Sequence, residues 1–129
     1  MQKPLHHLTN LFLKTILGSL FLWPHGVFAQ NTCTVNDGKN FQTYLSLHPE
    51  IKHIIFFSTW CSDCKEKLLE LKKKEELSKE YLLVNSFDQK GHGEKALEYL
   101  KISLPCFYDP NNLIAKEYNI FVVPGEVQR

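Results

Sequence analysis

Residues 51–65, IKHIIFFSTWCSDCK, join a dense apolar run to a pair of cysteines. The run from Ile51 to Phe57 is rich in β-branched and aromatic residues, which is typical of a central strand covered on both faces. Cys61 and Cys64 follow it directly, and the pattern from about Asp63 onward predicts a helix. A helix N-terminus carries partial positive charge and unpaired N–H donors, so it stabilises a thiolate over a thiol. This context favours thiol–disulfide chemistry at Cys61 and Cys64.

A structural zinc site is the alternative explanation of two cysteines at this spacing. Zinc sites of this type normally need a second Cys or His pair at matching spacing. The sequence contains no second pair of that kind. His92, between Gly91 and Gly93, is the nearest candidate for a third ligand in a module that binds copper or zinc. We expect no metal and no other cofactor.

Length and charge limit the remaining possibilities. The chain has 129 residues, enough for one domain, and a formal net charge of +1, which gives no electrostatic reason to expect nucleic acid as a partner. The first 29 residues resemble a cleavable signal peptide, with basic residues, a short apolar run (15–23) and small or modest residues before a cleavage site after Ala29. The apolar run is too short to span a bilayer. We therefore predict a domain over residues 30–129 that is periplasmic or secreted.

Two further cysteines, Cys33 and Cys106, remain after the predicted cleavage. Thiols outside the cytoplasm are oxidised unless a partner keeps them reduced, so a disulfide between these two is one possibility. Cys106 lies in an apolar run, however, where a cysteine can serve as a small buried hydrophobe. The sequence analysis favours an unpaired Cys106.

The mature chain predicts an α/β architecture. Residues 31–40 are polar and rich in turn formers, and the elements that follow alternate in the order α-β-α-β-α-β. The predicted elements are a helix near 41–47, the strand 51–57, a helix from about 63, a strand over 81–87, a loop over 89–93, a helix over 94–100, a short strand over 105–108 and a helical segment over 113–118. A helix between two strands makes them parallel.

These residues resemble the thioredoxin superfamily, and within it the secreted thiol–disulfide interchange proteins of the TlpA/ResA kind. The likeness rests on the cysteine motif after its strand, on the segments 105–109 and 115–120, and on the dipeptide Val123-Pro124. It extends over roughly residues 41–124. The resemblance implies a thioredoxin-like fold, a central sheet with flanking helices.

The resemblance also implies roles for individual residues. Cys61 would be the exposed nucleophile and Cys64 the resolving thiol, and both would be catalytic. Trp60, Val123 and Pro124 would bind substrate, with Pro124 in a cis peptide bond facing the cysteines. An ordinary core aromatic is the other interpretation of Trp60. The partners implied are a protein disulfide as substrate and a membrane or secreted thiol-redox protein.

Two departures from the family pattern affect this interpretation. Asp63 replaces the usual proline before the second cysteine; its charge should raise the pKa of a neighbouring thiolate and favour a reductant over an oxidant. Asp63 is equally compatible with a helix-capping role. Only five residues follow Pro124, so the C-terminal β-hairpin and last helix of the family are expected to be missing, leaving an open sheet edge.

The sequence therefore predicts a reductase of protein disulfides that acts outside the cytoplasm through Cys61 and Cys64. A non-catalytic or metal-binding thioredoxin-like module is the first alternative. An inactive truncated remnant is the second.

Overall fold

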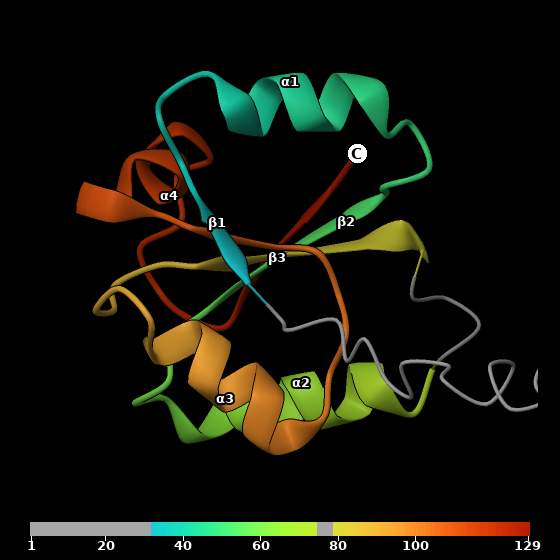
Figure 1. Ribbon diagram of the computed structural model, residues 1–129, viewed down its shortest axis with the longest axis vertical. Coiled ribbons are helices and arrows are strands. Elements are labelled where there is room, and N and C mark those ends of the chain that lie inside the picture. The colour runs from blue at the N-terminus through green and yellow to red at the C-terminus, as the bar shows by residue number, and fades with distance from the viewer. Residues whose placement is uncertain (1–31, 75–78) are drawn as a thin grey trace, which may run out of the picture.

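The computed structural model describes residues 32–74 and 79–129. The predicted signal peptide and its cleavage site at Ala29 lie outside these residues. The described part is a mixed α/β structure with one five-stranded sheet and helices on both of its faces (Figure 1). No helix in these two ranges is long and apolar enough to cross a membrane.

The sheet has the strand order β1-β4-β3-β2-β5. Four strands run parallel, and β5 pairs antiparallel with β2. The strands are β1 (Cys33–Val35), β2 (His53–Phe57), β3 (Tyr81–Asn85), β4 (Cys106–Tyr108) and β5 (Gly125–Gln128). Of the three interior strands β2, β3 and β4, the first two are almost wholly buried, as their dense apolar sequences predict.

One face of the sheet is covered by α2 (Ser62–Lys72) and α3 (His92–Leu100). The opposite face is covered by α1 (Asn40–Leu47) and by α4 (Leu113–Glu117), which follows the short 3₁₀ turn η2 (Pro110–Asn112). Figure 1 shows these two helical layers on either side of the strands. In α2 the buried stripe of Cys64, Leu68 and Leu71 holds the helix to the sheet, so the second thiol belongs to the core.

Several element boundaries differ from the sequence prediction. The strand β3 ends at Asn85, two residues before the predicted end, because Phe87 adopts a left-handed backbone with φ of 55° that breaks the extended chain. The helix α3 begins at His92 instead of Glu94, directly after Gly91, whose φ of 88° suits glycine. The residues between these two points form the loop that faces the cysteine motif.

The prediction of an unpaired Cys106 is wrong. Cys106 forms a disulfide with Cys33, and the two residues are direct partners in the register of β1 and β4, with Cα atoms 4.5 Å apart. Both are nearly inaccessible to solvent. The bridge fastens the three-residue strand β1 to its neighbour β4, although β1 lies in the segment 31–40, whose polar, turn-rich sequence predicts no strand.

The chain after Pro124 contributes one strand that the sequence did not predict. The strand β5 pairs with β2 from Gly125 to Gln128, so β2 is an interior strand and β5 is the edge strand on this side of the sheet. Glu126 of β5 accepts hydrogen bonds from His53 Nδ1 at 2.9 Å and from Lys67 Nζ at 3.1 Å. These contacts tie β5 to the strand before the cysteine motif and to the helix after it.

Candidate active site

Cys61 is the N-cap residue of α2, at the carboxyl end of β2. Its backbone is extended, with φ of −98° and ψ of 115°, and its Sγ accepts a hydrogen bond from the backbone N–H of Cys64 at 3.2 Å. The side chain is partly exposed. The sulfur thus caps an otherwise unpaired N–H group of the first turn and lies at the positive end of the helix dipole.

Cys64 is one turn further along α2 and is buried, with 1% of its surface exposed. Burial, together with the hydrogen bond to Cys61 and the charge of Asp63, raises the pKa of the Cys64 thiol to about 12. Both cysteines are free thiols. The pair is therefore asymmetric: one sulfur meets solvent at a helix terminus, and the other is kept protonated inside the core.

The Val123–Pro124 peptide bond is cis, as the resemblance implies. The carbonyl oxygen of Val123 lies 3.6 Å from Cys61 Sγ, within reach of a thiol donor. Val123 also packs against the buried clusters on both faces of the sheet. The structure thus brings Cys61, Cys64, Val123 and Pro124 together from two segments about 60 residues apart; a substrate-binding role for Val123 and Pro124 stays a prediction.

Trp60 is 69% exposed, so its interpretation as a core aromatic is wrong. Its indole Nε1 donates a hydrogen bond to the carbonyl oxygen of Phe87 at 2.8 Å. This contact fixes one edge of the ring while most of its surface faces solvent next to Cys61. The expected substrate-binding role of Trp60 stays a prediction.

Asp63 is exposed in the first turn of α2, where an acidic side chain interacts favourably with the helix dipole. The side chain that caps the helix belongs to Cys61, so the capping role considered for Asp63 is filled by sulfur. The effect of Asp63 on the redox balance stays a prediction.

His92 lies at the start of α3 with its Nδ1 3.2 Å from Asp88 Oδ1. Across residues 32–74 and 79–129, no three His, Cys, Asp or Glu side chains are grouped so that they could hold a metal ion. The ring of His92 is therefore paired with Asp88, and His92 and the two thiols form no group of this kind within these ranges.

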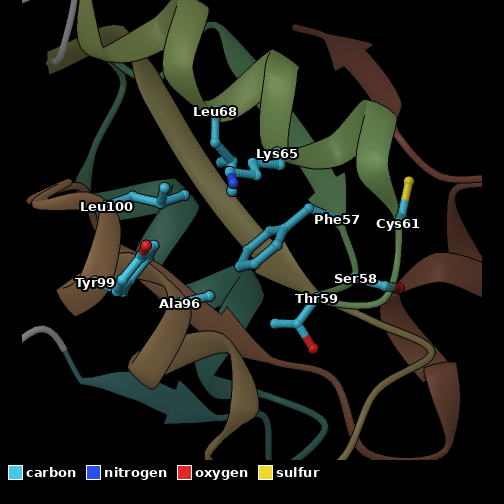
Figure 2. Close-up of a pocket in the computed structure, with 9 residues that line it drawn as sticks. All are labelled: Phe57, Ser58, Thr59, Cys61, Lys65, Leu68, Ala96, Tyr99 and Leu100. Carbon is cyan, nitrogen blue, oxygen red and sulfur yellow. The ribbon is translucent and has the colours of Figure 1, made fainter.

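A cavity of about 170 Å³ lies beside the motif, between α2 and α3. Figure 2 shows the ring of Phe57 at its centre, with Leu68 on the α2 side and Ala96 and Leu100 on the α3 side. The Cys61 sulfur points away from this cavity in the same view. Cys61 lines the cavity as well, but its Sγ lies 3.6 Å from the Val123 carbonyl oxygen.

One residue that contacts the segment leading into the motif was not predicted from the sequence. Asp88, in the loop after β3, accepts hydrogen bonds from the backbone N–H and the hydroxyl of Thr59, each at 2.7 Å. The two residues are 29 positions apart, and no local pattern in the sequence links them. Only the parallel pairing of β2 with β3, which places the carboxyl ends of both strands at one edge of the sheet, brings them into contact.

No protein-family model matches this chain, and no curated protein matches it in sequence.

Proposed function

We propose that this protein is a thioredoxin-like thiol–disulfide oxidoreductase that reduces protein disulfides outside the cytoplasm. The observation that carries the proposal is the asymmetry of the two thiols. Cys61 Sγ caps α2 and receives the Cys64 N–H at 3.2 Å, whereas Cys64 is buried with a pKa raised to about 12. A nucleophilic sulfur has to be accessible and close to hydrogen-bond donors, as it is at the start of a helix. A resolving thiol has to keep its proton until the mixed disulfide has formed, as a buried thiol with a raised pKa does.

The reaction proceeds in two exchanges. The Cys61 thiolate attacks one sulfur of the substrate disulfide, the substrate S–S bond breaks, and the other substrate sulfur leaves as a thiolate that takes a proton from water. Cys64 then loses its proton to water and attacks Cys61 Sγ. The bond between Cys61 and the substrate breaks, the Cys61–Cys64 disulfide forms, and the second substrate thiolate leaves and takes a proton from water. Two electrons and two protons pass from the dithiol to the substrate. A membrane or secreted thiol-redox partner has to return the two electrons before the next turnover.

Three further observations support this function. The sulfur lies at the carboxyl end of β2, the edge where open α/β sheets bind their ligands. The backbone carbonyl oxygen of Val123 lies 3.6 Å from Cys61 Sγ, so that Val123 and Pro124, the residues proposed to bind substrate, lie beside the proposed nucleophile. The buried Cys33–Cys106 disulfide is of the kind found in proteins of oxidising compartments, which supports an extracytoplasmic location.

Reduction of insulin disulfides by the purified protein, with dithiothreitol as electron source, tests the proposal. Cys61→Ser should reduce the rate to that of dithiothreitol alone, and Cys64→Ser should accumulate a mixed disulfide between Cys61 and substrate, visible by mass spectrometry. Ser62→Ala, an exposed position between the two thiols, is the matched control and should keep the parent rate. Activity that survives Cys61→Ser would refute the catalytic assignment.

A further inference from the structure

The loop after β3 is fastened to the segment that leads into Cys61. Three consecutive residues of that segment each donate a side-chain hydrogen bond to one of three consecutive residues of the loop. The pairs are Ser58 Oγ to the Ser86 carbonyl at 2.5 Å, Trp60 Nε1 to the Phe87 carbonyl at 2.8 Å, and Thr59 Oγ1 to Asp88 Oδ2 at 2.7 Å. The third pair differs from the others because its acceptor is a carboxylate, and hydrogen bonds to charged groups are the stronger ones.

The Asp88 carboxylate is the centre of these contacts, with a side chain that is only 4% exposed. Its Oδ2 accepts three hydrogen bonds, from Thr59 N and Thr59 Oγ1 at 2.7 Å each and from Asn85 Nδ2 at 3.1 Å. Its Oδ1 accepts a hydrogen bond from Gln89 N at 2.9 Å and is paired with His92 Nδ1 at 3.2 Å. Burial alone would raise the pKa of Asp88, but the hydrogen bonds from Thr59 and Asn85 outweigh it and hold the pKa below its ordinary value. Asp88 is thus a buried anion that is fully hydrogen-bonded at neutral pH.

Thr59 lies between two firmly held elements. Phe57 ends β2 inside the sheet, and Cys61 begins α2, whose inner face is packed in the core. The chain between them has to turn so that Cys61 Sγ arrives over the first N–H groups of the helix. Asp88 holds Thr59 by both its backbone and its side chain, two residues before the sulfur.

We propose that Asp88 is a positioning residue for Cys61, which it holds at the start of α2 by binding the backbone N–H and the hydroxyl of Thr59. This inference rests on the proposed redox function of the cysteine pair. Held in this way, the two thiols have a high effective concentration toward each other, which stabilises their disulfide relative to a disulfide with a small thiol. Loosening Thr59 lowers this effective concentration and leaves both cysteines in place.

The test uses two variants that alter the contact from its two sides. Thr59→Val keeps the size of the side chain and the backbone N–H, and removes the hydroxyl donor. Asp88→Asn keeps the size of the acceptor and removes its charge. Thr43→Val is the matched control, because the Thr43 hydroxyl in α1 donates a hydrogen bond to the carbonyl oxygen of the N-cap residue Lys39 at 3.1 Å.

The readout is the equilibrium constant of the Cys61–Cys64 disulfide against glutathione, measured on protein that circular dichroism shows to be folded. We expect a decrease of about fivefold for Thr59→Val and about tenfold for Asp88→Asn, with Thr43→Val unchanged. Thr59→Val removes no charge, so a decrease in that variant is not an electrostatic effect of the carboxylate. In the double variant the two effects should not add, because they break the same contact.

A constant within twofold of the parent value in Thr59→Val, even if its melting temperature falls, would overturn the proposal and leave the contact a structural one. If Asp88→Asn does not fold, Thr59→Val decides the question alone. The glutathione equilibrium needs no protein substrate, so it remains measurable if the protein fails to reduce insulin. Failure of the proposed function and failure of this inference therefore give different results.

Discussion

The backbone N–H of Cys64 points at the sulfur of Cys61, 3.2 Å away, and so links the two thiols before any disulfide joins them. The same turn of helix that gives Cys61 a donor places Cys64 in the core, with 1% of its surface exposed. One local geometry thus produces both an accessible sulfur and a protected one. The reactivity of the two sulfurs should differ accordingly.

Alkylation should distinguish the two thiols in the folded, reduced protein. At pH 8 a thiol with a pKa of about 12, such as Cys64, is far less ionised than one at the ordinary value of 9.0, and burial further limits access. We expect iodoacetamide to modify Cys61 at least about 100-fold faster than Cys64, as measured by mass spectrometry of the peptides. In concentrated guanidinium chloride, as control, the two rates should converge. Similar rates in the folded protein would contradict the burial of Cys64.

The raised pKa of Cys64 also predicts how stability changes with pH. The unfolded thiol ionises near 9.0, whereas the folded thiol keeps its proton until about pH 12, so the unfolded state releases protons first. The free energy of unfolding of the reduced protein should therefore fall as pH rises from about 9 to 12. Cys64→Ala should remove this part of the pH dependence in urea titrations, and an unchanged slope would contradict it.

Asp63→Asn should make the cysteine pair more oxidising. The carboxylate adds to the causes that raise the pKa of Cys64, and its removal favours ionised thiols and hence the reduced form. An effect of up to about one pKa unit, as expected for an exposed charge, corresponds to up to about 30 mV. The reduction potential measured against glutathione at low salt reports it, and the shift should shrink at high salt. Ser62→Ala, at the neighbouring position, is the control and should leave the reduction potential unchanged. An unchanged or more reducing potential in Asp63→Asn would refute the effect of the Asp63 charge on the cysteine pair.

The sequence could predict the parts of the fold that local patterns specify. The dense apolar run of β2 and the buried stripe of α2 identify the strand-to-helix junction, and this junction places Cys61 and Cys64. Positions that depend on distant partners could not be found in this way. The strand β1 has only three residues, in a polar context, and it is a strand because it pairs with β4 and is bridged at Cys33.

The strand β5, at the other edge of the sheet, and Asp88, at the candidate active site, could likewise not be predicted from local sequence patterns. The strand β5 has a largely polar sequence, and it is held by pairing with β2 and by the contacts of Glu126 with His53 and Lys67. Asp88 follows its strand as an ordinary polar loop residue would, and its role depends on Thr59, 29 positions earlier. Contacts of this range are properties of the strand order, which the sequence alone does not give.

Gly93→Ala should destabilise the protein, because α3 passes very close to β3 at this position. A Cβ atom on Gly93 would lie 2.6 Å from Cγ of Asn85, a buried side chain that itself bonds the Phe57 carbonyl. We expect a loss of about 1–3 kcal/mol in the free energy of unfolding, measured in urea. Lys95→Ala, at an exposed position of the same helix, is the control and should change stability by less than about 0.5 kcal/mol. If Gly93→Ala left the free energy of unfolding unchanged, α3 would be able to move away from β3 without a loss of stability.

The Cys33–Cys106 disulfide should be the main attachment of β1. It closes a separation of 73 residues, and a loop of this length restricts the unfolded chain enough to contribute about 4 kcal/mol to the free energy of unfolding. The measurement compares Cys33→Ala/Cys106→Ala with its parent in a Cys61→Ser/Cys64→Ala background, so that the number of possible disulfides is controlled. Hydrogen exchange should show the loss first in β1, where the Cys33 N–H is bonded to Glu94 Oε1 at 3.1 Å. A change below about 1 kcal/mol, or exchange that is no faster in β1 than in β3, would show that strand pairing alone holds β1 to the sheet.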